Sequence, residues 1–403
     1  MDPTPTTTRA PDAAGVQSPP PSLARLFLSF LRLGLTSFGG PAMVVYIREL
    51  AVRKRGWLSE ETFADGVALC QTVPGATAMQ TAAYVGLRAG GPVGALASFV
   101  GFGLPAFVLM LILSAVYQAT EGVPAVVSTF RGLHVVVIAI IAGATVSFGR
   151  ASIRNWRDVL PAAGAAAFLV FGGNPIIAIP ACGLLGTFLY MGMDIPARPG
   201  PKDARGSARK YLAFAALLAL CAAAGIAALF FVSRMLFDLS LLMMKVDVFA
   251  FGGGFASVPI MLHEVVDARQ WMDSKVFMDG LALGQVTPGP VVITATFVGY
   301  QLAGIWGAVV GTLAIFTPSF LMVLITVPYF DRLQRSLFFR RAIRGILGSF
   351  VGLLFAVALH FGIAVHWNIA AAALAVCAFA ALQLKVDILW VVLAGGLVSV
   401  FLL

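Results

Sequence analysis

The chain has 403 residues, of which 60% are hydrophobic and only 11% are charged. Soluble domains carry about a quarter charged residues, so this composition excludes a soluble protein and indicates a polytopic membrane protein. The net charge of +9 does not indicate nucleic-acid binding, because the basic residues are scattered in short loops between apolar runs instead of forming one patch.

The chain begins with a segment unlike the rest. Residues 1–22 are rich in Pro, Thr and Ser and lack the basic and apolar regions of a signal peptide, so we expect a disordered tail. From Leu23 to about Tyr46 an apolar run is interrupted by the sequence TSFGGP, and a basic loop follows. The sequence leaves open whether this interrupted run spans the membrane or re-enters it.

A Pro-Gly pair divides the next apolar stretch, which reads VALCQTVPGATAMQ from Val67 onward. Proline cannot donate to the helix ladder, and glycine tolerates the backbone angles of a break. Each half is shorter than the roughly 20 residues that a spanning helix needs. We therefore predict two half-helices that turn round inside the membrane, although a proline-kinked spanning helix is the alternative. Broken backbone at that depth must be buried in protein or line a wet cavity, which makes Pro74 and Gly75 a candidate binding site.

The second half of the chain repeats the first in register. The stretch LALGQVTPGP from Leu281 repeats the glutamine, proline and glycine of the first hairpin at an offset of 214 residues, and VFAFGGGFASVP repeats the earlier glycine-rich break at an offset of 213. An apolar segment at about 211–232 has no partner. We therefore divide the chain into a tail (1–22), an N-terminal repeat (23–192), a basic linker with a connecting transmembrane helix (193–235) and a C-terminal repeat (236–403).

The loop charges predict how the two repeats lie in the membrane. The loop with Arg53, Lys54 and Arg55 is strongly basic, whereas its counterpart at 263–275 is not; the bias reverses at 332–344, whose counterpart at 118–131 has few basic residues. Lysine and arginine stay in the cytoplasm. We therefore predict an all-α, multi-pass protein of two inverted-topology repeats with broken or re-entrant helices and a connecting helix. Its N-terminus would be cytoplasmic and its C-terminus periplasmic.

Inverted repeats with broken helices are typical of secondary transporters, which bind substrate near the bilayer midplane. The N–H groups and positive dipole at the start of each second half-helix favour an anion. Small and neutral polar side chains suit a tetrahedral oxyanion, and no cluster of Asp, Glu, His or Cys indicates a metal. The candidate substrate-binding residues next to the Pro-Gly breaks are Gln71, Pro74, Gly75, Thr77, Gln285, Thr287, Pro288 and Gly289.

A doubly charged anion also needs positive charge nearby, because removing an ion from water costs several kcal/mol. Four bases occur in repeat-related pairs. Arg32 and Lys245 lie inside apolar runs, and we favour a substrate-binding role for them. Arg131 and Arg344 lie at the ends of spans, where fixing the topology is the more common role.

Two further aspartates, Asp65 and Asp279, lie 214 residues apart. They are candidates for coupling as proton carriers, for partners of the bases, or for ordinary residues at a helix start near the interface. His134 has no histidine at the corresponding place in the other repeat, so we expect it to serve packing. No Walker loop, HExxH or GxSxG motif occurs, so we predict no enzymatic activity and no cofactor.

At these positions the sequence resembles the chromate ion transporter family, of the long type with two homologous halves. The resemblance covers residues 23 to 403 and rests on LGLTSFGGP (33–41), LCQTVPGAT (69–77), AFGGGFASVP (250–259) and ALGQVTPGPVVITATFVGY (282–300). It implies export of chromate across a bacterial inner membrane, chromate resistance, and sulfate as a competing analogue. The motif positions it adds to the candidate site are Gly39, Gly40, Pro41, Gly252, Gly253 and Pro290.

The sequence departs from the family pattern in two places. Ala76 follows Pro74-Gly75 where the family usually has a second proline, which predicts a hairpin that is more mobile or less involved in binding. Asp247 is more polar than the pattern of its run. The alternatives to chromate export are a sulfate or other oxyanion transporter on the same fold, a channel or scaffold, and an integral-membrane enzyme. The partners we expect are chromate and the lipid bilayer, with no nucleic acid, and the sequence permits a homodimer.

Overall fold

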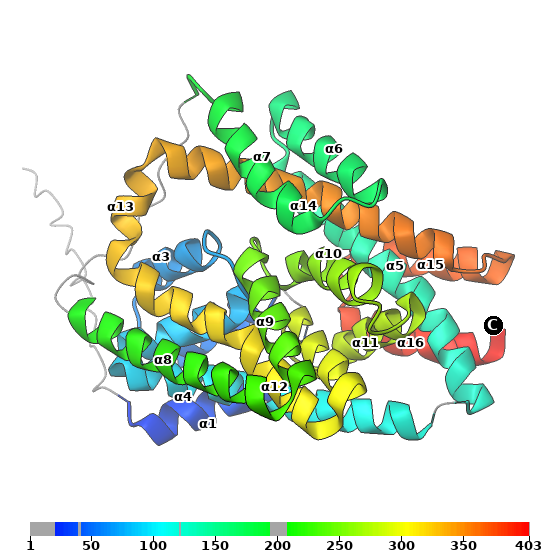
Figure 1. Cartoon of the computed structure of the whole chain (residues 1–403), viewed down its shortest axis with the longest axis horizontal. Helices are drawn as coiled ribbons and strands as arrows, with labels where there is room; N and C mark the ends of the chain where they lie inside the picture. The colour runs from blue at the N-terminus through cyan, green and yellow to red at the C-terminus, as the bar shows by residue number, and fades with distance from the viewer. Residues whose placement is uncertain (1–20, 39–41, 121, 194–207, 403) are drawn as a thin grey trace, which may run out of the picture.

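The computed structural model describes residues 21–38, 42–120, 122–193 and 208–402, and within these ranges the chain is helical with short turns and no strand (Figure 1). Nearly all of the predicted tail, Gly39, Gly40 and Pro41, and most of the basic part of the linker lie outside the described residues. Five of the described helices are long and apolar enough to cross a membrane. The protein is therefore a multi-pass membrane protein.

The two repeats contain corresponding helices. The first repeat consists of α1 (Leu23–Thr36), α2 (Ala42–Arg48), η1 (Glu49–Lys54), α3 (Glu60–Cys70), α4 (Thr77–Ala119), α5 (Pro124–Ser152), α6 (Trp156–Val170) and α7 (Pro175–Leu189). The second consists of α9 (Arg234–Phe249), η3 (Gly254–Ala256), α10 (Ser257–Leu262), η4 (His263–Ala268), α11 (Ser274–Val286), η5 (Val291–Ile293), α12 (Thr294–Thr326), η6 (Val327–Tyr329), α13 (Phe330–Arg335), α14 (Leu337–Ala364), α15 (Ile369–Gln383) and α16 (Ile388–Leu402). Even the π-helical turns η1 and η4 occupy matching places in the two repeats.

Both Pro-Gly stretches are interrupted, as the sequence predicts. In the first repeat α3 ends at Cys70 and α4 begins at Thr77; in the second, α11 ends at Val286 and η5 begins at Val291. The long helices that follow are kinked a second time, by non-helical residues at Gly90 and Gly91 in α4 and at Ala303 and Gly304 in α12. Each therefore consists of a short half-helix followed by a longer apolar helix, and the half-helices with α3 and α11 form the re-entrant hairpins.

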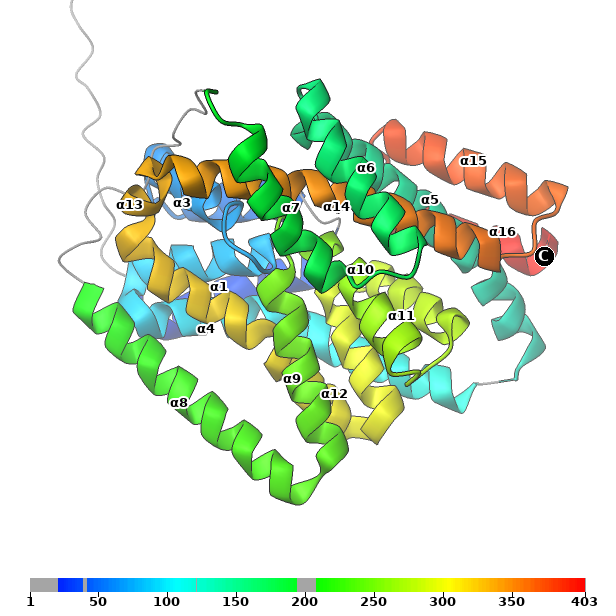
Figure 2. The same ribbon diagram turned by 45° about the horizontal axis from the view of Figure 1, so that its top comes forward.

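The repeats run in opposite directions through the molecule. In Figure 1, α4 ends on the right, where α5 begins, whereas α12 ends on the left, next to α13. Helix α1 begins on the left and the C-terminus lies on the right. The connecting helix α8 (Ala208–Val232) supplies the extra crossing between the two halves, packing against α9 and α12 (Figure 2). This confirms the predicted inverted-topology fold with a connecting helix.

The two repeats are also intertwined. Helix α14 of the second repeat packs against α6 and α7 of the first, and α5 of the first packs against α15 and α16 of the second (Figures 1 and 2). Small residues allow this close approach: a Cβ atom on Gly345 of α14 would lie 2.2 Å from the carbonyl oxygen of Cys182 in α7. Small residues at helix interfaces are typical of membrane proteins. The fold therefore depends on both repeats together.

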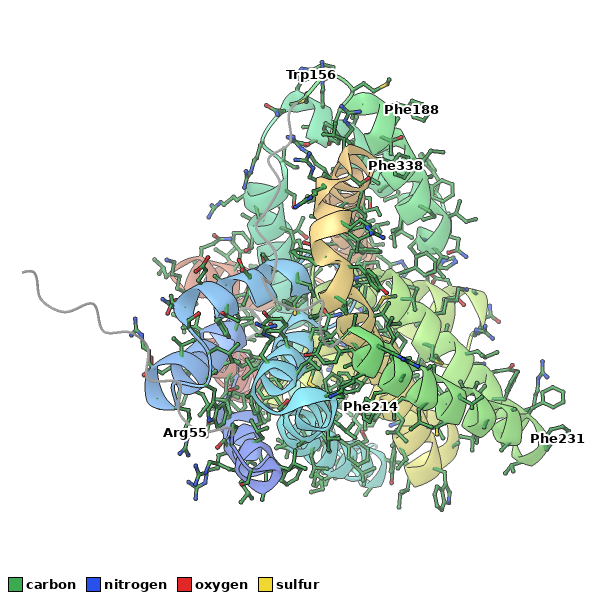
Figure 3. All side chains as sticks on the ribbon, turned by 90° about the vertical axis from the view of Figure 1, so that its left-hand side faces the viewer. Arg55, Trp156, Phe188, Phe214, Phe231 and Phe338 are labelled. Carbon is green, nitrogen blue, oxygen red and sulfur yellow. The ribbon has the colours of Figure 1, made fainter. Side chains whose placement is uncertain are left out.

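The outer surface is strongly apolar. Seen from one end, large side chains such as Phe188, Phe231 and Phe338 point outward (Figure 3), and all three are exposed. Only 6% of the apolar window of α8 is buried inside the protein. Exposed apolar area of this extent in a chain with long apolar helices is typical of a membrane-spanning protein.

Candidate functional site

Four interrupted segments meet near the centre of the molecule. The backbone N–H of Gly75, in the first Pro-Gly break, donates to the carbonyl oxygen of Ala250 at 2.9 Å, and the N–H of Gly289, in the second, donates to that of Ser37 at 3.2 Å. These donors are repeat equivalents of each other, and so are the acceptors. The two hydrogen bonds therefore form a pseudo-symmetric pair, and we call the place where Ser37, Gly75, Ala250 and Gly289 meet the central crossing.

Glycine is required at both donor positions. The φ angles of Gly75 and Gly289 are +120° and +125°, which other residues rarely adopt. A Cβ atom would lie 2.2 Å from Ser319 Oγ at the first position and 2.7 Å from Ala106 Cβ at the second. The central crossing is therefore closely packed, and no larger residue fits there without movement of α4 or α12.

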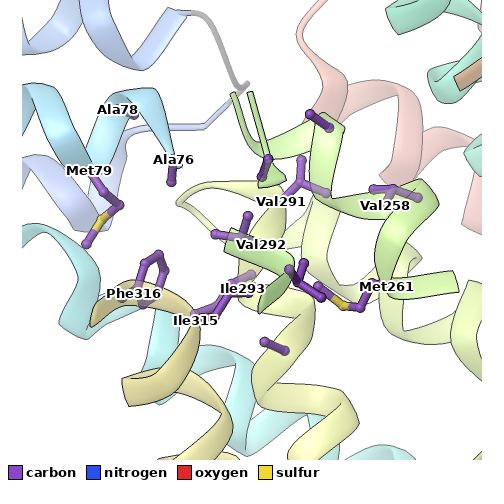
Figure 4. Close-up of a cluster of buried hydrophobic side chains, with 14 of the residues drawn as sticks. Ala76, Ala78, Met79, Val258, Met261, Val291, Val292, Ile293, Ile315 and Phe316 are labelled. Carbon is purple, nitrogen blue, oxygen red and sulfur yellow. The ribbon is translucent and has the colours of Figure 1, made fainter. Parts of the chain in front are cut away.

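Apolar side chains lie along one side of the central crossing. Met79, Ile293 and Phe316 belong to a buried cluster drawn from α4, η5 and α12 (Figure 4). Such surroundings exclude water and strengthen electrostatic interactions inside them. The polar groups at the crossing therefore lie in a dry environment.

Several buried polar atoms at the central crossing have no hydrogen-bond partner among the described residues: Ser37 Oγ, Gln80 Oε1 and Asp247 Oδ2. All three residues are fully buried. Buried polar atoms in native proteins are normally satisfied, so a group of unsatisfied ones needs an explanation. A polar ligand bound at the crossing would supply the missing partners.

A short chain of hydrogen bonds connects these groups to the first half-helix of α4. The N–H of Ala76, at the N-cap of α4, donates to Ser319 Oγ at 3.0 Å. That hydroxyl in turn donates to Asp247 Oδ1 at 2.9 Å. The side-chain amide of Gln80 donates to the carbonyl of Pro74. The start of α4 is therefore surrounded by polar groups from both repeats.

The structure brings some of the predicted site residues together and leaves others apart. Thr77 lies beside Gly253, where a Cβ atom would be 3.5 Å from the threonine hydroxyl. The hydroxyl of Thr287 donates within its own turn, to the carbonyl of Gly284. Gln71 is exposed and lines a groove of about 430 Å³ between α2 and α3. Pro74, Pro288 and Pro290 are buried, and Gly252 and Gln285 are partly buried.

The repeat-paired bases do not converge on the central crossing. Arg32 is exposed on α1. Lys245 Nζ lies 2.7 Å from Glu264 Oε1, and the other oxygen of that carboxylate lies 3.4 Å from Arg269 Nε. Arg344 pairs with Asp158. The remaining base, Arg131, lines a separate cavity.

That cavity has a volume of about 550 Å³ and lies between α5, α11 and the start of α15. At its inner end the buried carboxylate of Asp279 accepts from Tyr117 Oη at 2.7 Å and lies 2.6 Å from His134 Nε2. The expectation that His134 serves only packing is therefore wrong. Its partner is 145 residues away, and no repeat equivalent or local motif indicated it. Asp65, the equivalent of Asp279, is buried on α3.

The lining of this cavity is basic overall. Besides Arg131 and His134 it contains Lys275 and His366, and Asp279 is its one acidic residue among the described ones. A cavity lined by one sign of charge raises the local concentration of the opposite ion. It can therefore attract anions toward the half-helices of the second repeat.

Comparison with known proteins decides the family. A family model described as chromate transporter matches the chain twice, at residues 24–187 and 237–400. The chain belongs to the chromate transporter family. This chromate transporter family member is 43% identical to an uncharacterized transporter of Methanocaldococcus jannaschii, over 93% of this chain and 92% of that protein.

Two relatives carry the name chromate transport protein. The one from Cupriavidus metallidurans is 32% identical over 84% of this chain and 82% of its own length, and the one from Pseudomonas aeruginosa is 31% identical over 96% and 95%. No solved structure matches the chain. The family places the protein among transporters rather than enzymes, with two homologous halves in one chain.

Proposed function

We propose that this protein is a secondary active transporter that exports chromate from the cytoplasm across the bacterial inner membrane and so confers chromate resistance. The N-terminus would be cytoplasmic and the C-terminus periplasmic. Membership of the chromate transporter family supports the substrate. Inverted repeats with broken helices support alternating access, because this architecture lets one substrate site open to either side in turn.

The observation that carries the proposal is the group of unsatisfied polar atoms at the central crossing. An oxyanion needs several hydrogen-bond donors in a dry site. The N–H groups of Gly75 and Gly289 now donate to carbonyls of the opposite repeat. An oxyanion that enters between the Pro-Gly breaks can replace those carbonyls and accept both bonds, and the dipoles of the half-helices add favourable charge.

The substrate would reach the central crossing through one opening on each side. The basic cavity with Arg131 and Lys275 serves the second repeat, and the groove with Gln71 serves the first. The described residues of the central crossing are closely packed, so no continuous channel joins the two openings through them. Movement of one repeat against the other would break the two crossing hydrogen bonds and expose the site to one opening at a time.

Transport into everted membrane vesicles tests this proposal. Radiolabelled chromate should accumulate inside energised vesicles that contain the protein, and an ionophore that collapses the membrane potential should release it. Excess sulfate, which has the same charge and shape, should compete. Chromate that accumulates no further than the membrane potential alone drives a dianion would indicate a channel, and sulfate accumulation without chromate accumulation would indicate the sulfate transporter. Vesicles without the protein are the control.

A further inference from the structure

We propose that Asp247 binds the transported oxyanion directly: its carboxyl is protonated in the loaded site and donates a hydrogen bond from Oδ2 to an oxygen of the anion. This inference rests on the proposed function and adds a substrate-contacting residue from outside the Pro-Gly breaks. It also assigns the ligand class, a tetrahedral oxyanion that accepts a hydrogen bond from a neutral acid.

The position of Asp247 supports this role. It lies in the last turn of α9, three residues before Ala250, whose carbonyl accepts from Gly75. Its side chain is fully buried. Oδ1 is occupied by the hydroxyl of Ser319, which itself accepts from the N–H of Ala76 at the start of α4. Oδ2 has no partner among the described residues. The carboxyl is therefore linked, through hydrogen bonds of Ser319, to the N-terminal end of the α4 half-helix, which attracts anions. Its second oxygen forms no hydrogen bond with a described residue.

The charges around Asp247 favour the neutral acid. Within the described chain it forms no ion pair. Both bases on its own helix are already paired, Lys245 with Glu264 of η4 and Arg234 with Asp238. Of the elements packed against α9, helix α12 carries one titratable residue, Tyr300, far along the helix from Ser319, and α10 carries none. The charged residues of α8, Arg209 and Lys210, lie in its first turn.

An ionised carboxylate buried without a cation is costly, and it would repel a dianion. A neutral carboxylic acid held in an apolar site can instead act as a hydrogen-bond donor to an oxyanion. The site can thus offer a strong donor while adding no negative charge. The proton is present when the anion binds, so proton binding and anion binding are linked and each strengthens the other.

Only one side of the pseudo-symmetric crossing has this donor. The equivalents of Asp247 and Ser319 in the first repeat are Gly34 and Ala106. A Cβ atom on Gly34 would lie 2.4 Å from the carbonyl oxygen of Phe102, so no larger side chain fits there. The two repeats therefore differ at the crossing, and the anion is held toward the half that carries the acid.

Two substitutions of Asp247 separate the possible roles. Asp247→Asn keeps a hydrogen-bond donor but cannot ionise, whereas Asp247→Leu keeps similar volume and removes the donor. The matched control is Asp238→Asn, the same change on a half-buried residue of α9 that pairs with Arg234. Sulfate and chromate binding to each purified protein is measured by calorimetry across a pH series. Infrared difference spectra of each protein, recorded with and without bound sulfate, report the C=O band of any protonated carboxyl.

The two substitutions of Asp247 should change anion affinity and its pH dependence in different ways. Wild-type affinity falls as pH rises, because the acid form is lost, while Asp247→Asn binds with affinity close to the wild type at low pH and no longer depends on pH in that range. Asp247→Leu binds about 10- to 100-fold more weakly, the usual effect of losing a hydrogen bond to a charged group. Asp238→Asn behaves as the wild type. The acid band of the wild type disappears in Asp247→Asn.

The contrary outcomes are equally distinct. With sulfate bound, an acid band that is the same in the wild type and Asp247→Asn would show that Asp247 is ionised in the loaded site and would overturn the inference, as would wild-type binding by Asp247→Leu. Either result leaves the proposed function standing if the wild type still binds and transports chromate. A wild type that has the acid band but binds neither anion would overturn the proposed function and the inference together.

Discussion

At the scale of single residues, Asp158 makes the most strongly satisfied polar contact between the repeats. Arg344 of α14 forms a bidentate pair with it, at 2.8 Å from Nε to Oδ1 and 2.9 Å from Nη2 to Oδ2, and Tyr190 donates to Oδ1 at 2.6 Å. The backbone N–H groups of Arg154 and Asn155 also donate to Oδ2. This pair joins the second repeat to the α6–α7 hairpin of the first.

We expect Asp158→Ala to destabilise the protein by about 3–5 kcal/mol, because it leaves the charge of Arg344 partly buried without a partner. Thermal unfolding in detergent, followed by loss of the monodisperse peak, measures the effect. Arg344→Gln should be similarly harmful, whereas the double variant Asp158→Asn with Arg344→Gln should recover part of the loss, since neither charge remains. Single variants that melt with the wild type would contradict this account.

The sequence placed Arg344 only at the end of a span, where a topological role is common. Its actual partner is 186 residues away and belongs to the other repeat. The contact between His134 and Asp279 was unpredictable for the same reason: the two residues are far apart in the chain, and no spacing rule joins them. Local chemistry shows that a charge in an apolar run needs a partner, but chain topology decides which residue that partner is.

At the scale of elements, the Pro-Gly breaks were predictable because proline and glycine interrupt a helix by their own covalent structure. The reciprocal bonds from Gly75 to Ala250 and from Gly289 to Ser37 were not, because they join segments far apart in the chain. Whether the candidate site residues around these breaks bind substrate stays a prediction.

We expect Gly289→Ala to reduce chromate transport about 10-fold or more while the protein still inserts. The substitution forces a residue with a side chain to a φ of +125° and places its Cβ 2.7 Å from that of Ala106, a strain on the order of 1–3 kcal/mol. Vesicle uptake, normalised to the amount of inserted protein, is the measurement. The control is Gly225→Ala in α8, where nothing lies within 4 Å of the added methyl group; it should transport normally. Unchanged uptake by Gly289→Ala would show that transport does not depend on the backbone conformation of the second Pro-Gly break.

At the scale of the whole molecule, the constant offset of 213 to 214 residues and the reversed loop charges predicted two inverted copies, and helices α4 and α12 run in opposite directions (Figure 1). The exchange of helices between repeats was not predictable. Hydropathy marks α6, α7, α15 and α16 as apolar, but it carries no information about whether they pack on their own repeat or on the other. Small residues such as Gly345 permit the close contact without specifying it.

Inversion makes a prediction about the two π-helical turns. Lys54 in η1 and Asp267 in η4 lie in equivalent turns of the two repeats, and both are exposed. In a protein whose native cysteines, including the exposed Cys221 and Cys377, are replaced by serine, a cysteine at either position should react with a membrane-impermeant maleimide from one side only. Because lysine and arginine favour the cytoplasm, Lys54→Cys should be protected in intact cells and labelled in everted vesicles, and Asp267→Cys should show the reverse. Labelling of both from the same side would mean that the copies lie parallel, and two breaks entering from one face could not serve a site that opens alternately to each side.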